Sequence, residues 1–312
     1  MIREFIRKYI FAVKEIDDHI KINIFGMHPN FRIKTNLEFP EISECGLAGG
    51  DKSSGRIICS LTSIPKRIQY VDRVARCLLA QSKKPDMVVL WLAGDEFPEG
   101  EKQLPQKLLE LKKFGLTIKF CKNYRSYKKL VPALMEFPED YILTFDDDIY
   151  YGRDTVKNLW ESSLKNPRCV CCYRTGRIEL ENGKIKPIPN SVLIWNHPRD
   201  ASYNNIIMSG TGTLFPPHCL HGDILDENVF MRLMPSNDEI FFWAMAVLNR
   251  TKIVNTMGFD YKCIMLREQQ HTALSKINVE GSKCGIDGKS ALQLMAKTYP
   301  QIMEIIAEGM RE

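Results

Sequence analysis

From residue 56 onward, short apolar runs alternate with segments that carry apolar residues at helical spacing. Residues 68–81 place Val71, Val74, Leu78 and Leu79 on one helical face, and "LPQKLLELKKFG" predicts a helix that ends at its glycine. A short helix is expected to begin near Pro132. The runs that predict buried strands are "RIICSLTS", "DMVVLWLA", "LTIKF" and "YILTF". This alternation predicts an α/β fold with a mostly parallel sheet flanked by helices.

The pattern changes after residue 148. A helix is predicted over 154–165, then a strand in "RCVCCY", and the Asn182-Gly183 pair of "IELENGKIKP" is typical of a hairpin turn. A further strand, "SVLIW", and the glycine-rich "MSGTGTLFPP" lead to a helix over 237–249. We therefore expect a small antiparallel hairpin region within the same domain.

The N-terminal segment has a different character. Residues 1–15 have apolar residues at helical spacing with basic residues mainly off that stripe, which predicts an amphipathic helix. Such a helix lies either in an anionic membrane interface or against protein. The stretch "ECGLAGGDKSSG" predicts a flexible linker. The expected organisation is an N-terminal helix and linker over 1–55, a catalytic domain over 56–275, and a C-terminal lid and helix over 276–312.

Composition narrows the class of protein. The chain has 312 residues, 44% of them hydrophobic, which is enough for a large core. Its net charge of +5 suits an anionic small molecule or a membrane surface and falls short of a nucleic-acid-binding signature. The ten cysteines form no paired metal-binding spacing, and "RCVCCY" suits a buried strand, which fits a reducing cytoplasm. No apolar run is long enough to span a bilayer, so we expect a soluble or peripheral protein.

Three consecutive aspartates, Asp146, Asp147 and Asp148, follow directly after the apolar run "YILTF". Ligands bind at the carboxyl ends of the strands of such sheets, so the triplet lies where a site is expected. Adjacent carboxylates repel one another unless a cation neutralises them, and their hard oxygens suit Mg²⁺ or Mn²⁺. The alternative is a solvated acidic turn before the next helix.

The segment "ILTFDDDIYY" resembles the Asp-x-Asp segment of GT-A-fold glycosyltransferases, which bind a nucleotide sugar through a divalent metal. "YKKLVPAL" is similar to an element that precedes this motif in bacterial surface-polysaccharide transferases, and "SLTSIPKRI" resembles their first strand and nucleotide-binding loop. "KINIFGMHPNFRIK" looks like the lead-in of some capsule or lipopolysaccharide transferases. The resemblance extends over roughly residues 56–275 and implies a GT-A (Rossmann-like) sheet.

The resemblance implies roles for the donor site. Asp146 would contact the ribose or the metal, Asp148 would ligate the metal, and Asp147 would support them. Thr62 and Arg67 would contact the nucleotide, and the Arg67 guanidinium suits a phosphate or the face of a base. The alternative for Arg67 is an exposed charge at a helix entry.

Lys129 precedes the helix expected near Pro132, so its ammonium is a candidate for the donor diphosphate. Its neighbour Lys128 is the alternative. His271 is the only histidine in the C-terminal stretch, and GT-A enzymes often use a late histidine as a third metal ligand. A lone histidine is otherwise an ordinary polar residue. The glycines of "NVEGSKCGIDGKS" suit a mobile lid.

A second acidic motif, "SNDE", opens the helix expected over 237–249. Ser236 and Glu239 have the spacing of a capping box, which leaves Asp238 unexplained. In inverting GT-A enzymes an acid at a similar helix start removes the proton of the acceptor hydroxyl, so Asp238 is the candidate base and Glu239 the reserve. The small residues of "SGTGTLFPP" either let the backbone approach a substrate closely or form a plain turn.

The expected function is transfer of a sugar from a nucleotide-sugar donor, UDP-linked by resemblance, to a glycan or lipid-linked glycan acceptor. An anionic surface on the inner face of the cell membrane is a candidate partner, and nucleic acid is not expected. A sugar nucleotidyltransferase would normally carry a glycine-rich phosphate loop, which "SLTSIPKR" lacks. A non-catalytic carbohydrate-binding protein has no need for a metal site joined to a base. Both remain alternatives.

Overall fold

The structure is a computed structural model, and it describes residues 11–16, 19–24, 30–32, 37–49, 55–178, 180–181, 184–185, 199–256, 263–266 and 288–310. The central feature is an eight-stranded sheet with the order β13-β16-β9-β15-β7-β4-β5-β6. Its strands are β4 (Ile57–Thr62), β5 (Met87–Ala93), β6 (Leu116–Cys121), β7 (Tyr141–Phe145), β9 (Val170–Cys172), β13 (Arg199–Ser202), β15 (Thr213–Phe215) and β16 (Ile253–Asn255).

Strand direction divides the sheet into two parts. β6, β5, β4 and β7 are parallel neighbours, and β9 is parallel to β16. β15 runs antiparallel between β7 and β9, and β13 is antiparallel to β16. The predicted α/β fold with a mostly parallel sheet is therefore confirmed. The hairpin predicted at Asn182-Gly183 is present as the antiparallel pair β11 (Leu180–Glu181) and β12 (Lys184–Ile185), whereas "SVLIW" lies outside the described residues.

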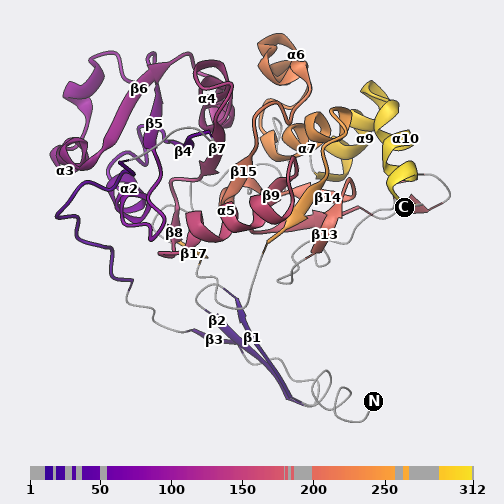
Figure 1. Cartoon of the computed structure of the whole chain (residues 1–312), viewed down its shortest axis with the longest axis horizontal. Helices are drawn as coiled ribbons and strands as arrows, with labels where there is room; N and C mark the ends of the chain where they lie inside the picture. Colours follow the sequence, from indigo (N-terminus) through magenta and orange to yellow (C-terminus); the bar gives the residue numbers. More distant parts are fainter. Residues whose placement is uncertain are drawn as a thin grey trace.

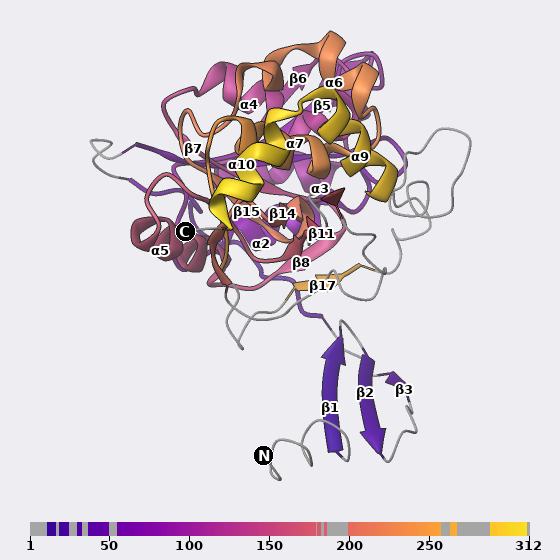
Figure 2. The same ribbon diagram turned by 90° about the vertical axis from the view of Figure 1, so that its right-hand side faces the viewer.

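Helices cover both faces of the sheet, as Figures 1 and 2 show. One core cluster packs the sheet against α4 and α7, and the other packs it against α2 and α5. Here α2 is Val71–Leu79, α3 is Gln106–Leu109, α4 is Val131–Glu136, α5 is Thr155–Lys165, α6 is Glu227–Leu233, α7 is Asp238–Leu248, α9 is Gly288–Thr298 and α10 is Gln301–Gly309. The helix predicted in "LPQKLLELKKFG" is present as α3 followed by the 3₁₀ helix η3 (Glu110–Phe114). Gly115 ends it in a left-handed conformation with φ of 111°.

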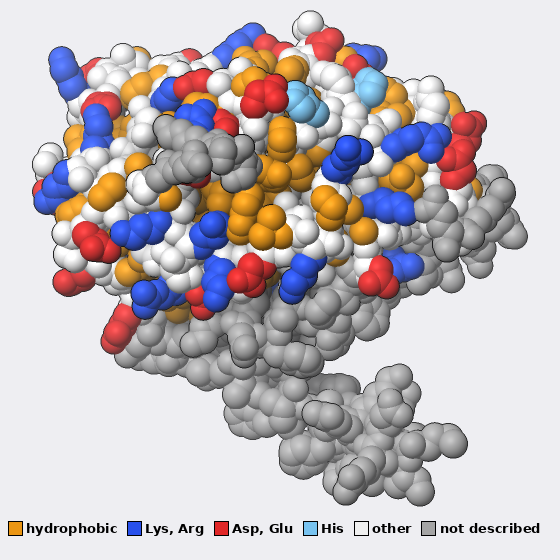
Figure 3. All heavy atoms as spheres, viewed as in Figure 1, with side chains coloured by type: hydrophobic (Ala, Val, Ile, Leu, Met, Phe, Trp, Pro, Cys, Tyr) orange, Lys and Arg blue, Asp and Glu red, His pale blue; other side chains and the backbone are white. Residues whose placement is uncertain are grey.

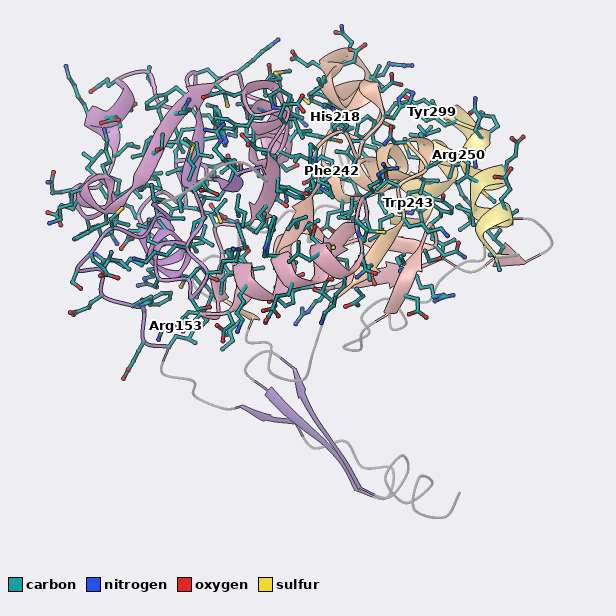
Figure 4. All side chains as sticks on the ribbon, viewed as in Figure 1. Arg153, His218, Phe242, Trp243, Arg250 and Tyr299 are labelled. Atoms are coloured by element: carbon teal, nitrogen blue, oxygen red, sulfur yellow. The ribbon has the colours of Figure 1, made fainter. Side chains whose placement is uncertain are left out.

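The C-terminal helices belong to this core. Buried side chains of α9 and α10, among them Met295 and Ile306, join the cluster that contains α7. Polar contacts add to the packing: the Tyr299 hydroxyl donates to Asp223 Oδ2 at 2.5 Å, and Arg250 Nη1 lies 2.8 Å from Glu308 Oε2 (Figure 4). The helix predicted after residue 275 is thus present and integral to the domain. The predicted lid, up to residue 287, lies outside the described residues.

The N-terminal segment departs from the helix expected over 1–15. Residues 1–10 lie outside the described part, and Phe11–Ile16 form strand β1, which pairs antiparallel with β2 (His19–Ile24). β3 (Asn30–Arg32) completes this small sheet. The helix prediction is wrong for residues 11–15. The physical reason is visible in "HIKINI", whose strict polar-apolar alternation provides a strand partner, and strand pairing then outweighs local helical spacing.

Half of the predicted flexible linker is docked on the domain. Gly46 N donates to Phe114 O at 2.9 Å and Ala48 N donates to Pro85 O at 2.7 Å. Leu47 packs against the core. Residues 44–49 are therefore a bound segment, and the linker prediction is wrong for them because their backbone hydrogen bonds are made to the domain.

Charges of both signs are interspersed on the face seen in Figure 3. Among the described residues of that face, Lys and Arg form no continuous basic patch. In the described part of the chain, no helix combines the length and apolar character that a bilayer crossing requires.

We expect Gly46→Ala to destabilise the domain. A Cβ at this position would lie 2.4 Å from the Leu79 carbonyl oxygen, so the docked segment must shift. Overpacking of this kind costs about 1–3 kcal/mol, measurable as a lower urea midpoint. Gly49→Ala is the matched control because no atom lies within 4 Å of the added Cβ. Equal midpoints for the two variants would contradict the docked position of this segment.

Candidate active site

The candidate residues converge at the carboxyl ends of β4 and β7. The loop after β4 provides Ser63 and Arg67, and the loop after β7 provides the aspartate triplet, 146–148. Parallel neighbours end at the same edge of a sheet, so residues far apart in sequence meet there. Three further segments reach this edge: the end of η4 (Arg125–Lys129), η5 (Ser209–Thr211) and the first turn of α7.

Arg67 neutralises two of the three aspartates. Its Nη1 atom lies 2.7 Å from Asp147 Oδ1 and 3.2 Å from Asp148 Oδ2. The Ser63 hydroxyl donates to the other oxygen of Asp147 at 2.5 Å. Asp147 is therefore held on both oxygens by protein groups, as suits a supporting residue, and Ser63 is a site residue that the sequence analysis did not single out.

Lys129 joins the two acidic motifs. Its Nζ atom lies 2.8 Å from Asp146 Oδ1 and 3.0 Å from Asp238 Oδ2, and its side chain is only 5% exposed. Burial by itself would lower the pKa of Lys129, but the carboxylates of Asp146 and Asp238 outweigh it and raise the pKa. The neighbouring Lys128 points elsewhere and pairs with Glu96 at 2.9 Å. Of the two lysines, Lys129 is therefore the one in contact with the aspartate triplet.

Burial perturbs the carboxylates of this edge. It raises the pKa of Asp148 to about 7, with the negative charge of Asp146 adding to the shift and Arg67 opposing it. The pKa of Asp147 is also raised by burial, against the effect of Arg67. Two internal cations, Arg67 and Lys129, thus offset part of the repulsion within the triplet.

Glu239 is the second residue of α7 and follows Asp238, the partner of Lys129. Its Oε1 atom accepts hydrogen bonds from Ser209 Oγ and Gly210 N, both at 3.3 Å. Burial raises the pKa of Glu239 to about 7, and the charge of Lys129 opposes the shift. The α7 N-cap is Asn237, whose Oδ1 accepts from Ile240 N, so the expected capping box from Ser236 is not the cap that forms.

The glycine-rich segment approaches the triplet directly. A Cβ added to Gly210 would lie 2.4 Å from Asp146 Oδ2, so a larger residue at position 210 would displace the Asp146 carboxylate. The close neighbour of Gly210 in the structure is thus an aspartate side chain, and approach of this backbone to a substrate stays a prediction. The neighbouring Gly212 has a φ of 104°, which favours glycine for conformational reasons.

Two predicted site residues stand apart from this group. The Thr62 hydroxyl donates to the Trp91 carbonyl at 2.8 Å, a contact between neighbouring strands of the sheet. His271 lies outside the described residues. The described residues nearest before His271 in the sequence are 263–266, which lie beside the aspartate triplet. There β17 (Cys263–Met265) pairs with β8 (Ile149–Tyr151), and Leu266 N donates to Asp148 O at 2.7 Å.

The residues fit a hard divalent cation in part. Asp146 is the most exposed of the three aspartates, at 33%, and in the described part of the chain its Oδ2 accepts no hydrogen bond. Carboxylate oxygens are the ligands that Mg²⁺ and Mn²⁺ prefer. Among the described residues, no group of three acidic, cysteine or histidine side chains has a metal-binding arrangement. A complete ligand set would therefore need a substrate or a residue from outside those ranges.

Comparison with known proteins gives likeness of fold alone. No protein-family profile matches the chain, and no curated protein matches it. Solved structures that align with it include S. aureus TarS residues 1–349, at 13% identity and a TM-score of 0.42 over 78% of this chain and 70% of that one. A CMP:2-keto-3-deoxy-manno-octonic acid synthetase complexed with CTP aligns at 11% identity and a TM-score of 0.42, over 72% of this chain and 100% of that one.

A 4-diphosphocytidyl-2C-methyl-D-erythritol synthase aligns at 13% identity and a TM-score of 0.35, over 58% of this chain and 84% of that one. Scores this low give no basis for residue roles. The site is therefore interpreted from the contacts of this chain.

We expect Lys129→Met to destabilise the fold strongly. The substitution leaves the Asp238 carboxylate, 8% exposed, without its cation. Removing one partner of a buried ion pair costs about 3–5 kcal/mol, measurable by urea unfolding at pH 7. Lys84→Met breaks the exposed pair with Glu44 and serves as the control, with an expected loss of at most about 1 kcal/mol. A loss for Lys129→Met no larger than that of the control would show that the buried pair contributes little.

Proposed function

We propose that this protein is a metal-dependent glycosyltransferase that moves a sugar from a nucleotide-diphosphate sugar to a hydroxyl of a glycan acceptor. One observation carries the proposal: the buried ammonium of Lys129 contacts Asp146 on the donor side and Asp238 on the acceptor side. A transferase needs a cation for the leaving diphosphate and a base for the attacking hydroxyl within one site. This contact supports both requirements at once.

On the donor side, Asp146 and Asp148 would hold a divalent cation, Mn²⁺ or Mg²⁺, with His271 as a candidate third ligand. A bound cation would stabilise the negative charge that develops on the departing diphosphate. Lys129 and Arg67 add positive charge at the same edge, and Asp147 with Ser63 keeps Arg67 in place. Thr62 remains a candidate for the nucleoside at the end of β4.

On the acceptor side, Asp238 would accept the proton of the attacking hydroxyl, with Glu239 as the reserve. Attack from the face opposite the leaving group would invert the anomeric configuration. UDP as the donor nucleotide rests on resemblance of the β4 loop, as does synthesis of a bacterial capsule or lipopolysaccharide glycan on the cytoplasmic side of the membrane. The basic N-terminal residues are the candidate contact with an anionic membrane.

The function is tested by nucleotide release from a panel of UDP-, GDP- and CMP-sugars with and without Mn²⁺. We expect metal-dependent release with at least one donor and an acceptor-stimulated rate. Pyrophosphate release from a nucleoside triphosphate and a sugar phosphate would instead indicate a nucleotidyltransferase. Binding of a glycan without turnover of any donor would indicate a carbohydrate-binding protein.

We expect Asp148→Asn to reduce metal-dependent turnover by at least about 100-fold, because it removes a proposed charged ligand. Asp140→Asn is a matched control: Asp140 also flanks β7 and pairs with an arginine, Arg56, but at the opposite end of the strand. It should lose stability and keep its turnover per folded molecule. Equal turnover in the two variants would refute the metal role of Asp148.

The pH dependence of turnover distinguishes the two candidate bases. Burial raises the pKa of two carboxylates of this site to about 7, Glu239 and the proposed metal ligand Asp148. The profiles are therefore compared at saturating Mn²⁺, where a bound cation would keep Asp148 ionised and leave Glu239 to titrate. If Asp238 is the base, Asp238→Asn loses about 10²–10⁴-fold at every pH, and Glu239→Gln keeps turnover but loses the rise near pH 7. If Glu239 is the base, turnover of the wild-type protein rises with pH through about 7, and Glu239→Gln is the variant that loses about 10²–10⁴-fold in turnover. The assignment of Asp238 fails in that second case.

A further inference from the structure

The hydroxyl of Tyr151 lies between two segments of the candidate site. It accepts a hydrogen bond from Asp146 N at 2.8 Å and donates to the Gly210 carbonyl at 2.6 Å. A phenol has one hydrogen to donate, and the short distance assigns it to Gly210. The hydroxyl therefore joins the backbone of the aspartate triplet to the backbone of η5.

The position of this hydroxyl is fixed by its ring. The Tyr151 side chain is 1% exposed, and its ring meets that of Phe145 edge to face, with centroids 4.8 Å apart. Its backbone lies in β8, paired with Cys263 of β17. A buried ring with a paired backbone has little freedom, so the two hydrogen bonds set where Asp146 and Gly210 lie relative to each other.

The spacing that results is close and continues to α7. A Cβ built on residue 210 would lie 2.4 Å from Asp146 Oδ2, so the Asp146 carboxylate lies directly beside the backbone of η5. The N–H of the same Gly210 donates to Glu239 Oε1 at 3.3 Å. The order of contacts is thus Asp146, Tyr151, Gly210 and Glu239.

We infer that Tyr151 is a positioning residue that sets the spacing between the metal-side carboxylate Asp146 and the acceptor-side carboxylates at the start of α7. The inference rests on the proposed function for its kinetic consequence. Tyr151 takes no part in bond making or breaking. Its role is to hold the donor and acceptor sides of the site in register, and misplacement by about 1 Å is enough to reduce turnover about 100-fold.

The test compares Tyr151→Phe with Tyr173→Phe in the full chain. Tyr173 is an equally buried control, 1% exposed, whose hydroxyl donates to the Thr155 carbonyl in α5 at 3.1 Å. We expect amide hydrogen exchange at Asp146 to become about tenfold faster in Tyr151→Phe, because its N–H loses its acceptor. The same variant should lower kcat by about 10–100-fold and raise the Mn²⁺ concentration that gives half-maximal rate. Tyr173→Phe should change none of these three quantities.

A second variant keeps the hydroxyl and alters the spacing. Gly210→Ala places a Cβ against Asp146 and should lower kcat to a similar extent, so the inference stays testable if Tyr151→Phe does not fold. Unchanged Asp146 exchange in Tyr151→Phe, or unchanged kcat in folded Tyr151→Phe or Gly210→Ala, would overturn it. If the wild-type protein turns over no donor, the proposed function fails, and the exchange measurement still decides whether Tyr151 holds Asp146.

Discussion

A single buried ammonium holds this site together. Lys129 lies between Asp146, in the loop that follows β7, and Asp238, the first residue of α7. Without that cation the two carboxylates, of which Asp238 is only 8% exposed, would repel each other. The loop after β7 and the first turn of α7 therefore both depend on Lys129 to lie close to each other. The Ser60 hydroxyl fixes its backbone by donating to the Lys129 carbonyl at 2.6 Å.

Two basic side chains reduce the electrostatic repulsion among the three adjacent aspartates. Arg67 contacts Asp147 and Asp148, and Lys129 contacts Asp146. Burial nevertheless raises the pKa of Asp148 to about 7. A divalent cation would thus join an existing arrangement of charges. Asp146, with a side chain that is 33% exposed, is the aspartate of the triplet that such a cation could reach most easily.

Local patterns predicted the elements of the sheet and the place of the triplet, because apolar runs of strand length and the rule that sites lie at carboxyl strand ends are both visible in sequence. The roles expected of Arg67 and Asp238 came from the resemblance to GT-A glycosyltransferases, and neither the resemblance nor the local pattern indicated that Lys129 would contact both acidic motifs. Phe11–Ile16 forms a strand because the neighbouring β2 pairs with it, a choice that helical spacing within residues 1–15 does not show. The segment around Gly46 is docked because its backbone hydrogen bonds go to Pro85 and Phe114, which are distant in sequence. The sequence analysis did not single out Tyr151, because the hydrogen bond of its hydroxyl is made to Gly210, 59 positions away.

The reversed direction of β15 separates two kinds of change in this fold. Because β15 runs against β7, the start of one strand lies beside the end of the other, and Gly210 meets Asp146 without any short connection between them. The chain that links the two strands leaves this edge and returns to it. Insertions or deletions in that excursion can therefore change the loops around this edge while Gly210 and Asp146 keep their contact. The order of the strands thus separates variable loops from a fixed pair of residues.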